Sequence, residues 1–392
     1  MTKTLAVTVV ADVTGAEQSL LNIAPLMRTR GIEMALATVP GGVFEKRWRA
    51  AGLEFCPLTV PDRQGFRPNS GVGYSSLGEY LTLPWRSMRA VSRVRRAARR
   101  SAADVIHSNR LITHLDCVLA ARLSGKSSII ELHDIVSPGV GRWALGVAAL
   151  LSGRTVAVSG AVRDQVPRWA RKRVVVIPQS VDLARFDGAH FVDAQSASGW
   201  RAELAADPDE PIIVAVGRID PEKGLGVLIR AVADMRRAGS RAQLALVGSP
   251  SKDADGGHLR DLRGLGESLL GQAFRWIPQV DDVPGVLHAV DVLACPSYAE
   301  PFGMIILEAQ VCGVPVVASA AGGPLEFVIE GETGLLVPPA DVTALARALE
   351  SLLGDEERRR DIASAGRAHA KDEYNADLRA DRFAALYEAV TG

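Results

Sequence analysis

The stretch from residue 290 to residue 318 constrains the fold of this 392-residue chain more than any other, because it reads as strand, turn, helix and strand. Residues 290–294 and 314–318 are short apolar runs of the kind that form buried strands. Residues 304–312 have helix-forming composition, and Gly313 and Pro315 indicate where the helix ends. The pattern predicts an α/β unit in which a helix joins two strands.

The turn of this unit has the features of a phosphate site. Glu300 lies in the turn and Glu308 lies in the helix, with Gly303 between them. Glycine lets a ligand approach the backbone closely, and the free amides at a helix N-terminus attract phosphate. We therefore expect the two acids to flank a bound sugar phosphate. In the alternative interpretation one acid complements the helix dipole and the other is solvated.

A second unit of the same kind covers residues 212–237. Residues 212–216 predict a strand and residues 225–237 a helix, and the turn between them contains Arg218 and Lys223. A planar guanidinium and an ammonium at the carboxyl end of a strand suit a diphosphate. The turn is not a Walker A loop, which needs Gly-x4-Gly-Lys-Ser/Thr. A surface turn with two solvated cations is the alternative.

The first half of the chain opens in a similar way. Residues 5–10 predict a strand and residues 17–28 a helix, with Gly15 between them. A dinucleotide fold would need Gly-x-Gly-x-x-Gly at this turn, and only one glycine is present. Further on, His107 and His133 each end a predicted strand. Ligands of open α/β sheets bind beyond the carboxyl ends of strands, so both are candidates, with buried structural histidines as the alternative.

Several of these motifs resemble those of retaining glycosyltransferases of family 4, the glycosyl transferases group 1, which have the GT-B fold. The resemblance covers nearly the whole chain and is carried by residues 300–308, 217–224, 322–324 and 331–334. Residues 14–17 resemble the Gly-Gly-x-Glu loop of the family, with Thr14 in place of the first glycine. Gln179 and Ser180 stand where the family commonly has Asn-Gly.

The resemblance implies an α/β protein with the GT-B fold, in which two Rossmann-like domains face each other across a cleft. Two domains also agree with the length of the chain. We expect an acceptor-binding domain at residues 1–186 and a nucleotide-sugar donor domain at residues 187–372. Residues 373–392 are expected to form a helix that crosses back to the first domain.

The resemblance further implies transfer of a sugar from a nucleotide diphosphate sugar, a UDP- or GDP-sugar above all, to a hydroxyl acceptor with retained anomeric configuration. Such transfer would serve cell-envelope glycan, exopolysaccharide or glycosylated-metabolite synthesis. A nucleotide-sugar isomerase or epimerase on the same fold and a non-catalytic nucleotide-sugar-binding protein remain alternatives.

The residues expected to act are carried over from the family motifs. The expected catalytic residues are Glu300, His133, Arg218 and Lys223. The expected donor-binding residues are Gly15, Arg218, Lys223, Gly248, Ile277, Glu300, Phe302, Gly303, Met304, Ile305 and Glu308. The expected acceptor-binding residues are His107 and Glu17.

No metal and no cofactor are expected, and the nucleotide sugar serves as co-substrate. Asp253 and Asp255 spell the Asp-x-Asp pattern that binds metal in the other glycosyltransferase fold, but here they lie in a predicted solvent loop. The four cysteines show no Cys-x-x-Cys spacing, which indicates buried thiols in a reducing compartment. We therefore expect a cytoplasmic protein.

Charge divides the chain into a basic and an acidic half. Residues 1–190 contain 26 Lys and Arg against 14 Asp and Glu, and the remainder contains 19 against 31. The first half is therefore expected to meet an anionic partner, such as a phosphate-bearing acceptor or an anionic membrane. Electrostatic pairing of the two halves is the alternative.

Two segments of the first half are candidates for partner contacts. Residues 85–100, which begin with Trp85, predict an amphipathic helix with seven arginines. This helix could contact anionic lipid at the inner face of the cell membrane, or it could simply be solvated. Nucleic acid is not expected, because no aromatic side chains lie among the arginines. The polar residues 59–76 predict an acceptor loop or a mobile surface loop.

Overall fold

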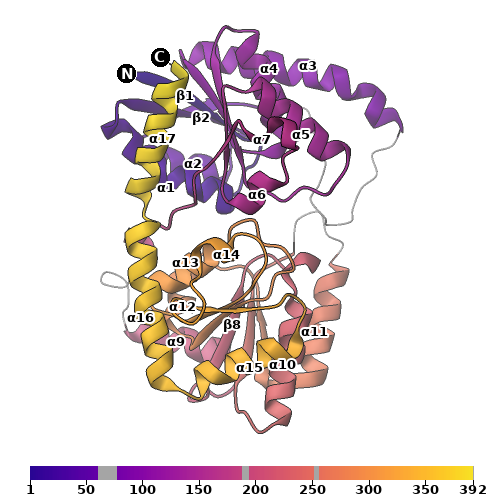
Figure 1. Cartoon of the computed structure of the whole chain (residues 1–392), viewed down its shortest axis with the longest axis vertical. Helices are drawn as coiled ribbons and strands as arrows, with labels where there is room; N and C mark the ends of the chain where they lie inside the picture. Colours follow the sequence, from indigo (N-terminus) through magenta and orange to yellow (C-terminus); the bar gives the residue numbers. More distant parts are fainter. Residues whose placement is uncertain (61–76, 188–193, 251–255, 392) are drawn as a thin grey trace. The chain divides into compact units, whose positions relative to one another are not determined.

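A computed structural model describes residues 1–60, 77–187, 194–250 and 256–391, which form two compact units (Figure 1). The first unit consists of residues 1–180 and 376–392, and the second consists of residues 181–375. The domain boundaries expected from the sequence lie a few residues from these and stay predictions. Most of residues 59–76, and both Asp253 and Asp255, lie outside the described residues.

The first unit is built on a parallel sheet of seven strands in the order β3-β2-β1-β4-β5-β6-β7. This is a Rossmann-like order, which places ligand sites at the carboxyl edge of the sheet. The strands are β1 Thr2–Val7, β2 Ile32–Thr38, β3 Glu54–Pro57, β4 Val105–Ser108, β5 Ser127–Leu132, β6 Arg154–Ala157 and β7 Val174–Val176.

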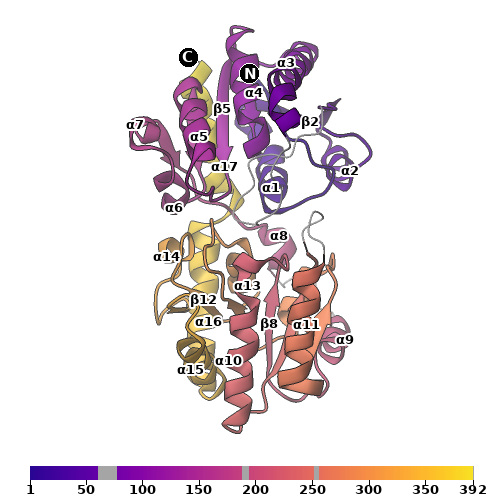
Figure 2. The ribbon, with the colours of Figure 1, turned by 90° about the vertical axis from the view of Figure 1, so that its right-hand side faces the viewer.

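Helices cover both faces of this sheet because its strands are apolar on both sides. The helices are α1 Gly15–Thr29, α2 Val43–Ala50, α3 Leu77–Arg100, α4 His114–Arg122, α5 Val140–Leu151, α6 Gly160–Asp164, α7 Arg168–Arg171 and α17 Ala376–Thr391. Ala6 and Leu36 pack with α1, α2 and α17, whereas Leu5 and Ala35 pack with α3 and α4. Figure 2 shows α17 behind the sheet and α4 in front of it.

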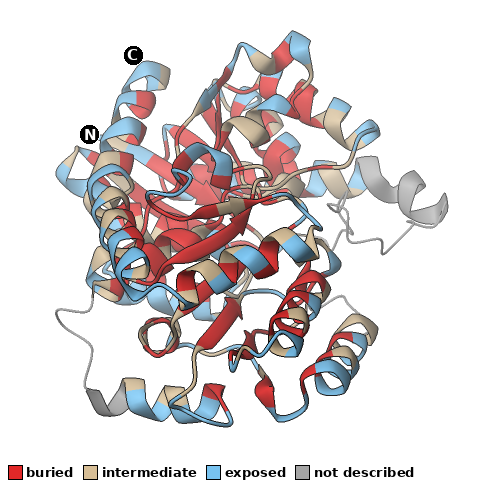
Figure 3. Ribbon diagram, turned by 60° about the horizontal axis from the view of Figure 1, so that its bottom comes forward, coloured by how far each residue is buried: buried red, intermediate tan, exposed pale blue. Residues whose placement is uncertain are grey.

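The second unit contains a parallel sheet of six strands in the order β10-β9-β8-β11-β12-β13. The strands are β8 Ile212–Val216, β9 Gln243–Val247, β10 Phe274–Ile277, β11 Val292–Cys295, β12 Val316–Ser319 and β13 Leu335–Val337. The helices are α8 Leu183–Phe186, α9 Ala194–Leu204, α10 Leu225–Arg237, α11 Gly257–Leu270, α12 Val283–His288, α13 Met304–Val311, α14 Pro324–Phe327, α15 Val342–Leu353 and α16 Glu356–Glu373. Figure 3 shows that the strands are buried and that most helices alternate buried and exposed residues.

The α/β class expected from the sequence is confirmed, and several expected elements lie where the pattern places them. The strand at 212–216 and the helix at 225–237 have the predicted bounds. The predicted helix at 304–312 is α13, which ends one residue earlier. The expected final helix is α17, which packs in the core of the first unit. Within the described residues, no helix is both long enough and apolar enough to cross a membrane.

Candidate functional site

In the second unit, four loops meet at the carboxyl edge of the sheet, after β8, β9, β10 and β11. Backbone hydrogen bonds join the loops: Ile219 N donates to Ser249 O at 3.0 Å, Gly248 N to Ile277 O at 2.9 Å, and Tyr298 N to Glu222 O at 2.8 Å. The structure therefore brings the Arg218–Lys223 turn, Gly248, Ile277 and the turn before α13 together.

Two glycines allow these loops to pack closely. A Cβ atom on Gly248 would lie 1.8 Å from the carbonyl oxygen of Gly217, and the φ angle of Gly248 is +149°. A Cβ atom on Gly224 would lie 2.1 Å from the carbonyl oxygen of Pro296. Because any other residue would clash with backbone at these points, glycine is required for the loops to meet.

Lys223 and Glu300 form an ion pair at the centre of this edge. Lys223 Nζ lies 2.7 Å from Glu300 Oε2, and the same carboxylate oxygen accepts a hydrogen bond from Ser297 Oγ at 3.0 Å. Burial by itself would lower the pKa of Lys223, but the Glu300 carboxylate outweighs it and the pKa is raised. The lysine is therefore cationic. Sequence reasoning missed Ser297, which lies three residues before Glu300 in the same turn.

Arg218 is the more accessible cation of the same loop. Its side chain is 53% exposed, and Nη1 lies 2.6 Å from Asp220 Oδ2. Nη2 lies 3.5 Å from Glu222 Oε1. These two acids orient the guanidinium while half of its surface stays open, so it can meet an anion that reaches this edge.

Helix α13 begins directly after Gly303, whose φ angle is +105°. Met304 and Ile305 form its first turn and are partly buried. The turn that precedes the helix carries Glu300, so an acid, a left-handed glycine and a helix N-terminus follow one another. A helix N-terminus directs backbone amides and a partial positive charge toward an anion.

Glu308 lies in the second turn of α13, and burial raises its pKa to about 7. Arg185 opposes this shift and Asp182 adds to it. The carboxyl group is therefore partly protonated at neutral pH. A ligand that hydrogen-bonds to the carboxylate would favour its ionised form.

Phe302 lies in the same turn, but its ring faces the core. The side chain is 5% exposed, and its ring centroid lies 5.0 Å from that of Phe327 and 6.2 Å from that of Tyr374. Ile277 is also buried, and its carbonyl oxygen accepts the Gly248 amide. These two residues can therefore offer a ligand backbone atoms rather than side chains.

In the first unit, the sequence-predicted residues lie at the carboxyl ends of β1, β4 and β5. Gly15 opens α1, and Glu17 Oε2 accepts hydrogen bonds from the Thr14 hydroxyl at 2.6 Å and from the Thr14 backbone amide at 3.2 Å. Glu17 is fully buried and holds Arg110, whose Nε and Nη2 lie 2.8 and 2.7 Å from its two oxygens. Burial raises the pKa of Glu17, but Arg110 outweighs burial and the pKa is lowered.

Arg110 is a residue of this edge that sequence reasoning missed. Its side chain is 23% exposed, whereas that of Glu17 is fully buried, so the cation of the pair is the part that reaches the surface. The one available signal was its position just after the predicted strand that ends at His107. The partner lies 93 residues away in the chain, and no local pattern indicates such a pair.

His133 is nearly buried and is held at both ring nitrogens. Nε2 lies 2.9 Å from Asn109 Oδ1 and 3.3 Å from Glu131 Oε1. Nδ1 lies 2.9 Å from Gln179 Nε2. Burial lowers the pKa of His133 despite the nearby Glu131. Sequence reasoning named His133 but gave no role to the residues that hold its ring.

His107 is fully buried beside α17. Its Nδ1 lies 2.6 Å from Tyr387 Oη, its Nε2 lies 3.2 Å from Glu131 Oε2, and its ring stacks on Phe383 at 5.7 Å. The ring is thus surrounded by protein, and the acceptor role expected for His107 stays a prediction. Arg379 of α17 completes the cluster with an ion pair to Glu131 and a hydrogen bond to Ile177 O at 3.0 Å.

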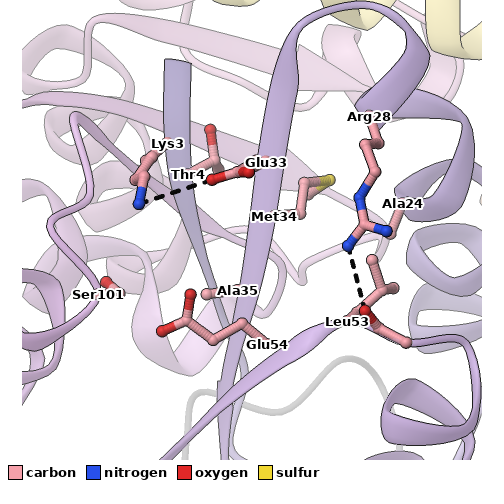
Figure 4. A pocket seen from close by; sticks show the side chains of 11 residues that line it. Lys3, Thr4, Ala24, Arg28, Glu33, Met34, Ala35, Leu53, Glu54 and Ser101 are labelled. Atoms are coloured by element: carbon pink, nitrogen blue, oxygen red, sulfur yellow. Dashed lines mark hydrogen bonds and ion pairs between the residues drawn. The ribbon is translucent and has the colours of Figure 1, made fainter. Parts of the chain in front are cut away.

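A separate cavity of about 310 Å³ lies at the other end of the first sheet, among residues that begin the strands (Figure 4). Its charged side chains are largely engaged, since Lys3 Nζ lies 3.6 Å from Glu33 Oε2 and Arg28 Nη2 donates to Gly52 O at 3.1 Å. It is not part of the candidate site. In the part of the chain that the structure describes, no three His, Cys, Asp or Glu side chains are grouped to hold a metal. The four cysteines are free and buried, as expected.

Two family profiles match the chain. The profile of glycosyl transferases group 1 matches residues 197–369, and the profile of glycosyltransferase family 4 matches residues 13–185. The first match covers the loops around Lys223 and Glu300, and the second covers Glu17 and His133.

Curated relatives match either part or most of the chain. A D-inositol 3-phosphate glycosyltransferase of Nocardia farcinica is 37% identical over 208 residues, which are 51% of this chain and 44% of that protein. The match with this relative thus spans less than half of its length. An alpha-maltose-1-phosphate synthase of Mycolicibacterium smegmatis is 30% identical over 317 residues, which are 74% of this chain and 80% of that protein.

Solved structures share the fold over the full chain. A crystal structure of Anabaena HepE in complex with UDP and glucose has a TM-score of 0.81 and 24% identity, and it covers 99% of this chain and 100% of that one. A structure of HepE in complex with UDP-glucose has a TM-score of 0.82 and 23% identity, with the same coverage. At this identity the likeness concerns the fold.

Proposed function

Because the chain belongs to the glycosyl transferases group 1, within glycosyltransferase family 4, we propose that it transfers a sugar from a nucleotide diphosphate sugar to a hydroxyl group of an acceptor. The family and the GT-B fold expected from the sequence are thereby confirmed. The observation that supports the proposed activity best is the grouping of Arg218, Lys223 and the start of α13 at one edge of the second sheet.

The proposal gives each of these groups a role in the departure of the diphosphate. Negative charge grows on the diphosphate as its bond to the sugar breaks, and Arg218, Lys223 and the amides of residues 303–305 would stabilise it. These groups are already held in place, so little reorganisation is needed during the reaction. Lys223 would keep its bond to Glu300 and meet the phosphate with another of its three ammonium hydrogens.

The carboxylates would orient the rest of the donor. Glu300 would accept hydrogen bonds from the sugar hydroxyls, with Ser297 and Lys223 fixing its orientation. Glu308 would hold the ribose hydroxyls from the second turn of α13. The main chain of Gly248, Ile277 and Phe302 would complete the donor site of the second unit. For Gly15 and His133, the family resemblance implies roles at the diphosphate and at the transferred sugar.

Retention of the anomeric configuration follows from the family resemblance. In the proposed step, the acceptor oxygen attacks the face of the sugar from which the diphosphate leaves. The C–O bond to the diphosphate breaks, the bond to the acceptor forms, and the leaving phosphate takes the acceptor proton. No separate cofactor takes part in this scheme, and the nucleotide sugar is the co-substrate.

A UDP-sugar is the first donor to test, because the HepE structures contain UDP with glucose and UDP-glucose. For the acceptor we propose a molecule with an anionic group. The first half of the chain carries 26 basic against 14 acidic residues, and Arg110 lies at the carboxyl edge of its sheet. Two relatives are also named for an inositol phosphate and a sugar phosphate.

The experiment is a panel of UDP-, GDP-, ADP- and TDP-sugars tested by thermal unfolding and by nucleotide release, with inositol and hexose phosphates as acceptors. A donor at 100 times its dissociation constant stabilises the protein by about 2.7 kcal/mol, which gives a readable shift. Release of nucleotide together with an α-configured product from an α-configured donor supports the proposal. An altered donor sugar without release indicates an isomerase or epimerase, and a thermal shift without turnover indicates a binding protein.

Lys223→Ala should lose the donor-induced thermal shift and at least about 100-fold of the transfer rate, because an ionic contact to the leaving group is removed. The variant should still fold. Lys46→Ala, which removes an exposed lysine of α2 in the first unit, is the matched control and should behave as wild type. Wild-type turnover in Lys223→Ala would contradict the site.

We also propose that α3 contacts anionic membrane. Its C-terminal half packs in the first unit through Val91 and Val94, whereas Trp85 is 54% and Met88 70% exposed. The guanidinium of Arg89 lies 3.4 Å from the centre of the Trp85 ring. Exposed apolar side chains beside arginines suit the boundary between headgroups and acyl chains.

Vesicle sedimentation tests this contact. Trp85→Ser with Met88→Ser should reduce binding to vesicles that contain phosphatidylglycerol, and vesicles of phosphatidylcholine alone should bind little. Leu269→Ser, which changes an exposed leucine of α11 in the second unit, should leave binding unchanged. Equal binding of all variants would place any membrane contact elsewhere.

A further inference from the structure

Gln179 departs from the residue that is common at this point of the family, and the structure gives it a partner. Its side-chain amide nitrogen lies 2.9 Å from Nδ1 of His133, which is proposed to lie beside the transferred sugar. Gln179 is 4% exposed and follows β7 after two residues, whereas His133 follows β5. The two residues therefore meet at the same edge of the sheet.

The other ring nitrogen of His133 faces two acceptors. Nε2 lies 2.9 Å from Asn109 Oδ1 and 3.3 Å from the Glu131 carboxylate. The orientation of the Asn109 amide is fixed independently, because its Nδ2 donates to the carbonyl oxygen of Ala16 at 3.0 Å. The amide oxygen therefore points at the ring, and Nε2 must carry a proton to donate to it.

The hydrogen-bond partner of Nδ1 determines the protonation state of that nitrogen. The group that faces Nδ1 is the NH₂ of Gln179, a donor, so Nδ1 must be an unprotonated acceptor. We propose that Gln179, together with Asn109, holds His133 as the neutral Nε2–H tautomer, and that Gln179 is thus a positioning residue for the proposed transfer. The inference rests on the proposed function for the place of His133 beside the sugar.

The tautomer has a consequence for the reaction. Both ring nitrogens of His133 are occupied by protein groups, so the ring cannot take the acceptor proton without breaking the bond to Gln179. The proton therefore leaves with the phosphate. The ring instead links the loop after β7 to Asn109, which bonds to the carbonyl oxygen of Ala16 at the start of α1.

One alternative arrangement exists and makes the proposal testable. Gln179 Oε1 is buried and has no hydrogen-bond partner among the residues that the structure describes. If the amide were turned over, Oε1 would accept a hydrogen bond from a protonated Nδ1, and His133 would be an imidazolium. Burial and Arg379 oppose that state, while three acids favour it. The charged and titratable groups around the ring are Glu17, Arg110, Glu131, Asp134, His107, His114 and Arg379.

The first measurement reads the ring directly. Nitrogen-15 NMR of the histidine rings, with His133 assigned by the loss of its signals in His133→Gln, should show protonated Nε2 and unprotonated Nδ1 from pH 6 to pH 8. A wild-type His133 protonated at both nitrogens at pH 7 would overturn the proposal. This result needs no donor or acceptor, so it stands even if no transfer is found with any sugar nucleotide.

The second measurement uses Gln179→Glu, which replaces the donor at Nδ1 by a carboxylate and so favours the imidazolium. At pH values below the pKa of His133 in this variant, the rate of transfer should fall by about tenfold per pH unit. At pH values above that pKa, the rate should approach that of wild type. A loss of transfer activity that does not depend on pH would show that Gln179 has a merely structural role and would overturn the proposal.

Two further variants separate the effect of the hydrogen bond to His133 from the effect of side-chain packing. Gln179→Met removes the donor without supplying a charge. Its His133 should keep the proton on Nε2, because Asn109 still accepts from it, and the Nδ1 resonance should shift because Nδ1 loses its hydrogen bond. Gln165 is a matched control, since it is also buried and bonds to the same loop, at Asp134 O and Val136 N, both 2.6 Å away. Gln165→Met should lower stability and leave both ring-nitrogen resonances of His133 unchanged.

Discussion

Glu308, which we propose binds the ribose, lowers the stability of the ligand-free protein when its carboxyl group is ionised. Burial raises its pKa to about 7, whereas the ordinary value is 4.5. Because the pKa is raised on folding, the stability that depends on the protonated form is present below pH 4.5 and is lost as the pH rises to about 7. At neutral pH and above, the folded chain therefore holds a poorly solvated carboxylate.

Glu308→Gln should accordingly be more stable than wild type at pH 8, by about 1–3 kcal/mol, and nearly equal to it at pH 4.5. The same variant should bind the donor more weakly, because an amide accepts fewer hydrogen bonds from ribose hydroxyls than a carboxylate does. Thermal unfolding at both pH values, with and without donor, measures the two effects.

Glu332→Gln, which changes an exposed acid of the second unit, is the control and should show no stabilisation at pH 8. An equal stability difference at both pH values for Glu308→Gln would show that ionisation of Glu308 is not its cause.

Single residues of the candidate site could be predicted from the sequence where the chemistry lies within one short motif. Arg218 and Lys223 share one turn, and Glu300 and Glu308 flank another. Arg110 and Gln179 could not be predicted in this way, because each acts on a partner in another loop. Their own neighbours in the sequence give no sign of that partner.

At the scale of elements, α17 and β5 are joined by a buried ion pair. Glu131 is fully buried, and Arg379 of α17 is 2% exposed. Burial raises the pKa of Glu131, but His133 and Arg379 outweigh it and the pKa is well below its usual range, so the carboxylate is ionised. Removing one charge of such a pair leaves the other buried without compensation.

Arg379→Met should destabilise the first unit by about 3–5 kcal/mol, because the Glu131 charge loses its partner. Glu131→Gln combined with Arg379→Met should recover a large part of this loss, since no charge then remains buried. Denaturant unfolding of the single and double variants measures the coupling between the two residues.

Arg30→Met is a suitable control, since Arg30 also bonds to α17, at Asp381 and Asp377, but its acids are exposed. Arg30→Met should lower the free energy of unfolding by about 1 kcal/mol or less. A double variant no more stable than Arg379→Met would contradict the account of the buried pair.

Elements were predicted well where hydrophobic pattern and turn residues agree. β8 and α10 have the expected bounds because an apolar run, a glycine-containing turn and an amphipathic helix follow in order. In α3 the expected apolar face is only partly buried, since Val91 and Val94 pack in the core and Trp85 and Met88 do not. A helical pattern shows which residues share a face but not how much of that face is covered.

At the scale of the whole molecule, the chain passes from the first unit to the second after residue 180 and returns after residue 375. The returning segment supplies Phe383 and Tyr387, both fully buried, to a core made otherwise by residues 6–177. The first unit therefore depends on both ends of the sequence, whereas the second is continuous.

Removal of residues 376–392 should unfold the first unit and spare the second. Loss of a buried aromatic side chain costs about 3–5 kcal/mol, and several such side chains together exceed the usual stability of a domain of about 5–15 kcal/mol. Circular dichroism should show a large loss of structure, while the remaining thermal transition should still rise with donor if the second unit binds it alone.

Fusion of residues 376–392 back onto the truncated chain is the control and should restore the first transition. Truncated protein that unfolds in the same single transition as wild type would contradict the dependence of the first unit on α17.

The placement of α17 also bears on how the protein is made. The strands of the N-terminal sheet precede α17 in the chain, so they leave the ribosome before the α17 side chains that pack on one face of that sheet. Until α17 is made, this face lacks part of its cover, although α1 and α2 already pack on it, and the nascent chain offers apolar surface to chaperones and to other chains. The continuous unit can fold before α17 is made, whereas the discontinuous one cannot be completed without it.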